Sequence, residues 1–295
     1  MNLALTVLEI TAPVFVLGAA GFAWVRLGYE YPTEFVTRLA MTFAVPCLIF
    51  TALVGTRIEP GALAALSIAA ALSYALVALV TFGIVKALRL SLRGYLAPLT
   101  FGNTGNLGLP LALFAFGDVG LGLAVVVFAI MAIAMFTVGL WMVAGAANPA
   151  RVLREPILWA SVLGVICLIV DWTPPEVAMN SLGLMGQLGI PLMLLTLGAA
   201  VARLKPANVL PALGLSAAKL AIGLVIAAGV GLATGLTGVA FSILVLQLAT
   251  PVGVSSYLLA ERYKADPDAV AGLVVVSTLL AIAALPVTLS FLLQH

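Results

Sequence analysis

The sequence has few charged residues for its length. Charged side chains make up 8% of its 295 residues, against about 25% in an ordinary soluble domain. Because so few charges cannot cover the surface of a water-soluble chain, the composition excludes a soluble globular enzyme and a disordered chain. The formal net charge of +2 provides no basic surface for nucleic acid. The class that remains is a polytopic membrane protein, in agreement with a mean hydropathy of +1.26.

Metal ligands and catalytic groups are also scarce. The single histidine is the terminal His295, and both cysteines, Cys47 and Cys167, lie inside apolar runs. We interpret the cysteines as small buried hydrophobic residues and expect no metal site and no resident cofactor. An intramembrane enzyme would need a nucleophile–base or metal constellation, so we expect no enzyme. The first basic residue is Arg26, and the sequence therefore predicts no cleavable signal peptide.

Long apolar runs are abundant instead, since 64% of the residues are hydrophobic. A membrane-spanning helix needs about 20 apolar residues, and continuous runs favour helices over the alternating strands of a β-barrel. We expect an all-α membrane protein with ten transmembrane helices. The expected spans are residues 10–28, 34–55, 61–88, 93–117, 120–144, 155–171, 177–201, 208–235, 239–260 and 268–293.

The basic residues predict the orientation of these spans, because Lys and Arg are retained on the cytoplasmic side. With both termini outside, the external loops carry only Arg57, and Lys219 lies within a span. The other eleven of the thirteen basic residues are cytoplasmic: Arg26, Arg38, Lys86, Arg89, Arg93, Arg151, Arg154, Arg203, Lys205, Arg262 and Lys264. We therefore expect a multi-pass protein of the cell's inner (plasma) membrane with both termini outside.

Two similar segments lie half a chain apart. The second span contains Val45–Thr51 and the seventh contains Ile190–Thr196, each with a proline followed five residues later by a threonine. The two prolines and the two threonines are each 145 residues apart. Five spans per half would make repeats 1–147 and 148–295 run through the membrane in opposite directions, as in secondary transporters. We expect one transmembrane domain, residues 1–295, built from these inverted repeats.

The fourth and ninth spans are interrupted by polar and helix-weakening residues. The segment 100–110 holds three glycines, two asparagines and a proline, and the segment 247–256 surrounds a proline with polar residues. Glycine and proline weaken helix continuity, and free backbone groups inside a membrane are tolerated only in protein or a watery cavity. Paired interrupted helices indicate a transporter site, although proline, glycine and amides can also merely kink packed helices and hold them together.

Such a site suits an anion. Exposed N–H groups and the positive end of a half-helix attract negative charge, and no acidic residue lies in either break. A proton antiporter would place an ionisable residue there. The candidate substrate-binding residues are Asn103, Thr104, Asn106, Gly108, Pro110, Gln247, Thr250, Pro251, Gly253 and Ser255.

Two ionisable residues are candidates for charge support or ion coupling. Lys219 lies near the centre of the eighth span, where a lysine costs roughly 2.5–3.5 kcal/mol on insertion scales. It supports the substrate carboxylate, or pairs with an acid such as Asp118 or Glu9, or extends towards the interface. Glu9 starts the first span and is the acid best placed for proton coupling. Neutral amides and backbone carbonyls could also ligate Na⁺, so sodium coupling remains open.

The interrupted spans also resemble a known family. Asn103-Thr104 through Gly108-Leu109-Pro110 looks like the Asn-Thr-x-x-x-Gly-x-Pro motif of the auxin efflux carriers, within the bile-acid and auxin carrier superfamily. The later matches are Gln247, Ala249, Pro251, Gly253-Val254, Ala260, Tyr263, Pro267-Asp268 and Leu285–Leu289, and Pro13–Phe15 and Pro46 also fit. The resemblance covers essentially the whole chain and is most specific from the ninth span to the tenth.

This resemblance implies a fold like that of sodium/proton antiporters, with helices four and nine crossing at the substrate site. It implies a dimerising scaffold of helices one, two, six and seven, and an elevator movement of helices 3–5 and 8–10. The implied activity is an efflux carrier of small organic anions, secondary active or facilitative. The alternative is a sodium- or proton-coupled symporter of organic or bile acids. Residues 145–154 form a short loop, and Val252 and Val254 make the ninth break less polar than in the plant carriers.

Overall fold

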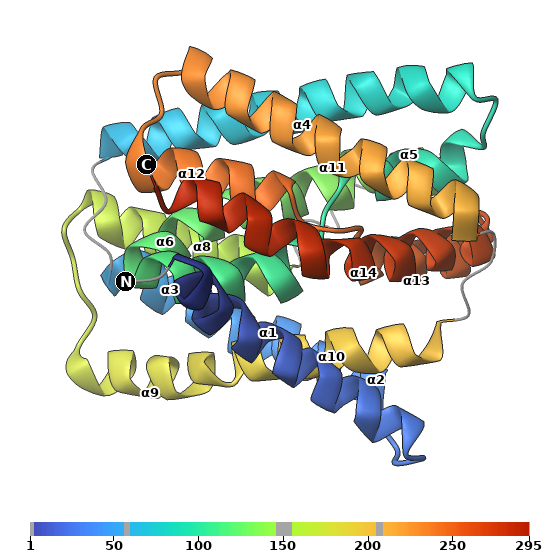
Figure 1. Ribbon diagram of the computed structural model, residues 1–295. Helices are drawn as coiled ribbons and strands as arrows, with labels where there is room; N and C mark the ends of the chain where they lie inside the picture. Colours follow the sequence, from blue (N-terminus) through green and yellow to red (C-terminus); the bar gives the residue numbers. More distant parts are fainter. Residues whose placement is uncertain (1–2, 56–59, 146–154, 205–208, 295) are drawn as a thin grey trace.

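The computed structural model describes residues 3–55, 60–145, 155–204 and 209–294 (Figure 1). The regular elements within these ranges are helices, and the sequence prediction of an all-α protein is confirmed for them. The α-helices are α1 (Leu3–Arg26), α2 (Thr33–Leu39), α3 (Val45–Gly55), α4 (Pro60–Ala87), α5 (Leu92–Thr100), α6 (Leu109–Ala134), α7 (Leu140–Ala144), α8 (Pro156–Ile169), α9 (Glu176–Gln187), α10 (Gly189–Arg203), α11 (Val209–Ala233), α12 (Gly238–Leu248), α13 (Val254–Tyr263) and α14 (Pro267–Leu292). Three short π-helices connect some of them: η1 (Ala40–Ala44), η2 (Thr104–Gly108) and η3 (Met135–Gly139).

Seven helical segments of the described residues are long and apolar enough to cross a membrane. They are Leu5–Arg26, Thr33–Gly55, Gly61–Ala87, Thr104–Ala144, Glu176–Arg203, Val209–Ala233 and Pro267–Leu292, and α8 and α12 are shorter apolar helices. The coarse prediction of several apolar spans is confirmed, while the number of ten stays a prediction. The sequence places two spans where Thr104–Ala144 forms one segment. That segment changes direction at Gly117, whose φ of +63° and ψ of −156° lie outside the helical region.

The helices pack in two groups. In the first, α1 runs along α10, and α3 packs against α8 and α9. In the second, α11 packs against α4, α12 and α14, and α4 also contacts α5 and α6. Figure 1 shows α4 and α11 crossing at the top, with α9 and α10 at the bottom. These groups contain the helices that the sequence assigns to a scaffold and to a moving part, and those roles stay predictions.

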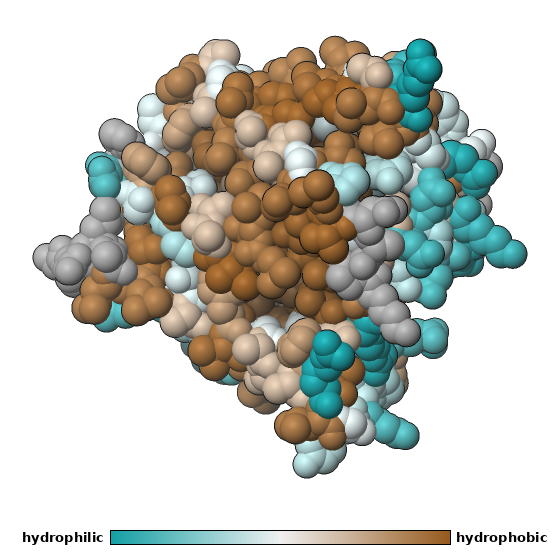
Figure 2. All heavy atoms as spheres, turned by 45° about the vertical axis from the view of Figure 1, so that its right-hand side comes forward, coloured by the Kyte–Doolittle hydropathy of each residue, from teal (hydrophilic) through white to brown (hydrophobic). Residues whose placement is uncertain are grey.

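Large apolar side chains are exposed on the outer faces of the long helices. Leu79 on α4 and Leu210, Val225 and Leu232 on α11 are each about two-thirds exposed or more. Figure 2 shows hydrophobic side chains covering the middle of one face, with hydrophilic side chains gathered towards its right-hand edge. An apolar surface of this extent suits a membrane and not water.

The orientation of the spans stays a prediction. Four of the basic residues that carry the prediction, Arg57, Arg151, Arg154 and Lys205, lie outside the described residues. The marks for the two chain ends both lie on the left side of Figure 1.

Candidate functional site

The two interrupted segments cross each other in the interior of the molecule. Gly102, just after α5, and Val252, between α12 and α13, pair in an isolated antiparallel bridge. The Asn103 N–H donates a hydrogen bond of 2.7 Å to the carbonyl oxygen of Pro251. The first break is narrower than the polar segment suggests, because only residues 101–103 leave the helical conformation before η2 begins.

Proline and glycine explain where the helices stop and restart. Pro251 has no N–H to continue α12, and its carbonyl is instead used by Asn103. Pro110 is the second residue of α6 and follows directly on η2, so its missing N–H falls where the preceding turn is a π-helix and not a regular α-helix. Gly108 allows the first break to pack closely against the side chain of Gln247, because a Cβ atom at this position would lie 2.1 Å from Oε1 of Gln247. The local chemistry therefore produces two broken helices that touch.

Two helix N-termini begin at the crossing. The helix formed by η2 and α6 starts at Thr104, and α13 starts at Val254 after the extended residue Gly253. The first N–H groups of each helix have no acceptor within that helix. Together with the helix dipole they form a positive end that favours an anion. The crossing thus presents partial positive charge without a charged side chain.

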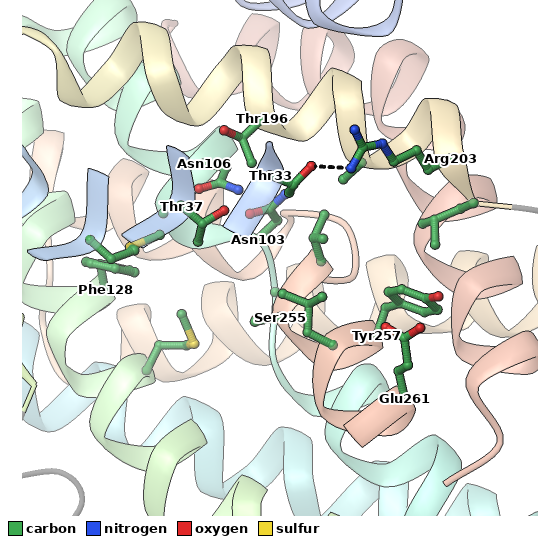
Figure 3. Close-up of a pocket in the computed structure, with 18 residues that line it drawn as sticks. Thr33, Thr37, Asn103, Asn106, Phe128, Thr196, Arg203, Ser255, Tyr257 and Glu261 are labelled. Atoms are coloured by element: carbon green, nitrogen blue, oxygen red, sulfur yellow. Dashed lines mark hydrogen bonds between the residues drawn. The ribbon is translucent and has the colours of Figure 1, made fainter. Parts of the chain in front are cut away.

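A cavity of about 380 Å³ lies against this crossing. The amides of Asn103 and Asn106 and the hydroxyl of Ser255 lie on one part of its wall, and Phe128 and Met131 form an apolar part (Figure 3). The other lining residues are Thr33, Thr37, Met41, Gly102, Gly105, Thr196, Ala200, Arg203, Leu204, Val254, Tyr257, Leu258 and Glu261. We call this cavity the crossover pocket.

Of the predicted site residues, Asn103, Asn106 and Ser255 line the crossover pocket. The other predicted residues of the two breaks do not line it. Thr104, Gln247 and Thr250 are buried, and the Thr250 hydroxyl donates to the carbonyl of Gln247 at 2.6 Å. Gly108, Pro110, Pro251 and Gly253 shape the backbone of the crossing.

Several buried polar atoms at the crossing have no hydrogen-bond partner within the described part of the chain. They are Nδ2 of Asn103, Oγ1 of Thr104, and both Oε1 and Nε2 of Gln247. A buried polar group without a partner costs about 1–3 kcal/mol. Such groups are rare in folded proteins, and each needs an explanation. Because four such atoms lie at the crossing, we take the crossing as the candidate functional site.

Lys219 and Glu9 both lie outside the crossover pocket. Lys219, in the middle of α11, is 5% exposed, and its Nζ donates a hydrogen bond of 3.0 Å to the carbonyl oxygen of Thr250. It therefore contacts the second break on the side away from the crossover pocket. Glu9 is exposed on α1, and Asp118 lines a separate cavity of about 480 Å³ beside α3 and α9.

The sequence analysis missed the part of the pocket wall that comes from outside the two breaks. Arg203, at the end of α10, donates to the Thr33 hydroxyl at 2.7 Å and to the carbonyl of Tyr31. The Tyr31 and Thr196 hydroxyls share a hydrogen bond of 2.8 Å, and burial raises the pKa of Tyr31. The spacing of Thr196, Ala200 and Arg203 places all three on one helix face. From this spacing the contribution of α10 to the pocket could have been predicted.

Thr33, Thr37 and Tyr257 were not singled out by the sequence either. Glu261 was not singled out as a site residue either, and the structure places it in the pocket wall. These residues lie near helix ends. From sequence alone such positions cannot be distinguished from ordinary loops, because the pocket forms only when α2, α10 and α13 come together.

Comparison with known proteins shows the class to which the chain belongs. The family described as "Membrane transport protein" matches residues 6–153 and 147–289. An "Uncharacterized transporter" of the archaeon Methanothermobacter thermautotrophicus is 27% identical over 299 aligned residues, which cover 94% of this chain and 96% of the relative.

Two rice proteins from Oryza sativa subsp. japonica, named "Probable auxin efflux carrier component 1b" and "1d", are each 27% identical over 149 residues. These matches cover 48% of this chain and 26% of each rice protein. The family match extends over most of the chain, so the assignment of the chain to a family does not depend on the partial matches to the rice proteins. The chain therefore belongs to the auxin efflux carrier family of membrane transport proteins, and it is a multi-pass membrane transporter and not an enzyme.

Proposed function

We propose that this protein is an efflux carrier of small organic anions, either secondary active or facilitative. The observation that carries the proposal is the convergence of two helix N-termini with Asn103, Asn106 and Ser255 on one wall of the crossover pocket. The names of the rice relatives support an organic acid as cargo. Auxin-like acids and other carboxylates are therefore the substrate class to test.

The pocket suits an anion that has an apolar part. A carboxylate is an acceptor, and the N–H groups and amides of the crossing are donors. Phe128, Met131 and Met41 offer an apolar surface to the rest of the molecule. The volume of about 380 Å³ falls within the range of roughly 300–1,000 Å³ that is usual for small-molecule sites. The pocket wall contains one acidic side chain, Glu261, and one basic side chain, Arg203, so the ionisable groups of the wall have no net formal charge and the donors of the crossing favour the anion.

The proposal includes an elevator movement between the two packing groups. The crossover pocket lies between them: α2 and α10 form one side, and η2, α6 and α13 form the other. A displacement of the second group along the first would carry the crossing from one membrane face to the other. Ten spans in two inverted repeats, a homodimer formed through the first group, and external termini complete the proposed architecture.

Transport by the purified protein in proteoliposomes tests this function. The assay compares uptake of radiolabelled indole-3-acetate and of a panel of mono- and dicarboxylates. We expect Asn106→Asp to lower the rate at least tenfold for every transported acid, because a second negative charge in the pocket repels the substrate. Asn180→Asp, on the exposed surface of α9, is the matched control and should keep the wild-type rate. Equal rates for Asn106→Asp and wild type would remove the crossover pocket from the transport path.

A further inference from the structure

Lys219 lies at the carbonyl end of α12, behind the second break. The last carbonyl groups of a helix have no N–H partner within the helix, and this end carries the negative part of the helix dipole. Thr250 lies just beyond this end, and its carbonyl oxygen accepts the hydrogen bond from Lys219 Nζ at 3.0 Å. A positive charge is thus held where a broken helix presents negative charge.

The backbone of α11 is built to bring this lysine close. Gly223 lies one turn after Lys219 on the same face, and a Cβ atom at Gly223 would lie 2.4 Å from the carbonyl oxygen of Leu248. Any larger residue would move α11 away from the end of α12. Lys219 and Gly223 therefore form one unit that packs against the carbonyl end of the broken helix.

The surroundings of the ammonium group are neutral and nearly filled. The space beside it measures about 10 Å³, which is about the size of one water molecule or less. Its walls contain no acidic side chain: they are Ser216, Leu220, Ala249, Thr250, Pro251, Ser277, Leu280 and Ala281. A further ion cannot enter this space while Lys219 occupies it.

The first break is supported differently. There the ring of Tyr74 stacks on Phe101, with centroids 6.1 Å apart, and the Thr81 and Thr100 hydroxyls lie 3.2 Å apart in a hydrogen bond. These partners are neutral. The cation is therefore a particular property of the second break and not a general requirement for ending a helix in this fold.

We propose that Lys219 is a built-in cation that takes the place of a mobile Na⁺ ion at the second break. Carbonyl oxygens at the end of a broken helix are the groups that bind Na⁺ in transporters, and here a tethered ammonium neutralises them. Lys219 is accordingly a positioning residue that holds the crossing in shape without touching the cargo. Only the consequence for ion coupling rests on the proposed function. If the protein is a carrier, its transport should not require a Na⁺ ion bound at the second break.

Thermal unfolding of the purified full-length protein in choline, sodium or methylammonium chloride at equal ionic strength tests the proposal without a transported substrate. Wild-type Tm should agree within about 1 °C in all three salts. Lys219→Ala should lower Tm in choline by about 4 °C or more, because the Thr250 carbonyl loses its partner. Methylammonium or Na⁺, entering the vacated space, should restore part of that loss.

Two further variants separate charge from packing. Lys219→Met fills the space without charge, and its lowered Tm should not respond to cations. Lys86→Ala, which removes an exposed lysine of α4, should behave as wild type. Three results would each overturn the proposal. The first is a higher Tm of the wild type in sodium than in choline, and the second is a Lys219→Ala variant as stable as the wild type. The third is a fall in the Tm of Lys219→Ala that neither cation restores. If Lys219→Ala does not fold, Lys219→Arg must be more stable than Lys219→Met, and equal stability would overturn it.

Discussion

Gln247 shows how one residue can be kept at a cost to stability. Its side chain is completely buried, it packs against Gly108, and neither its oxygen nor its nitrogen has a hydrogen-bond partner among the described residues. A methionine of similar shape would fill the same space without polar atoms to desolvate. The presence of glutamine therefore points to a requirement during transport.

Replacement of Gln247 should affect stability and transport in different ways. Gln247→Met should keep the wild-type Tm or raise it by a few degrees, because it removes two unsatisfied polar atoms. The same variant should transport organic anions more slowly. Thermal unfolding and proteoliposome transport on one preparation measure both effects. A clear fall in Tm would show instead that the amide makes stabilising hydrogen bonds.

Single residues of the site could be predicted from the sequence where they interrupt an apolar run. Asn103, Asn106 and Ser255 stand out because polar side chains beside glycine or proline are unexpected inside a membrane. Arg203 could not be recognised in this way, since a basic residue at a helix end is what the cytoplasmic side of any membrane protein shows. Its place in the pocket depends on how α10 packs, which no local pattern records.

Among the helices, the positions of the two interruptions were easier to predict from the sequence than the π-helices and bends. Proline and glycine predict where α5 and α12 end, because both residues act through the local backbone. Pro46 follows η1 by two residues and η3 ends at Gly139, but neither residue alone predicts a π-helix. Likewise α9 and α10 meet at Leu188, where one continuous span was expected. Helix irregularities of this kind depend on neighbouring helices, so the run of apolar residues alone does not show them.

The kink at Gly117 yields a prediction at this scale. Its φ of +63° and ψ of −156° lie in a region that is essentially restricted to glycine, and other residues are strained there by roughly 1–3 kcal/mol. Gly117→Ala should therefore lower Tm by several degrees. Gly214→Ala on α11 is the matched control, since a Cβ atom there meets nothing within 4 Å, and its Tm should stay the same or rise. Equal Tm values for both variants would contradict the assigned kink.

At the scale of the whole molecule, composition was sufficient for the class and insufficient for the pocket. Scarce charge and long apolar runs predict an all-helical membrane protein because each helix can be recognised separately. The crossover pocket requires α2 and α10 of one packing group to face α13 and η2 of the other. Contacts between such distant segments cannot be predicted from the spacing of apolar residues along any one helix. The pocket also contains residues near helix ends that the sequence predicts to be cytoplasmic.

The proposed function places an organic anion in the crossover pocket, and the orientation predicted from the sequence makes the pocket accessible from the cytoplasm. The most direct test of both is the labelling rate of Ser255→Cys in a background with Cys47→Ala and Cys167→Ala, using a membrane-impermeant maleimide. A thiol at the N-terminus of α13 should be reactive, and the control is Ser91→Cys, at the exposed N-cap of α5 in a loop that the sequence predicts to be cytoplasmic. We predict labelling of both variants from the cytoplasmic face only, slowed by the transported acid at Ser255→Cys and unchanged by it at Ser91→Cys. Labelling from the outer face alone, or at a rate that the acid does not change, would contradict the account.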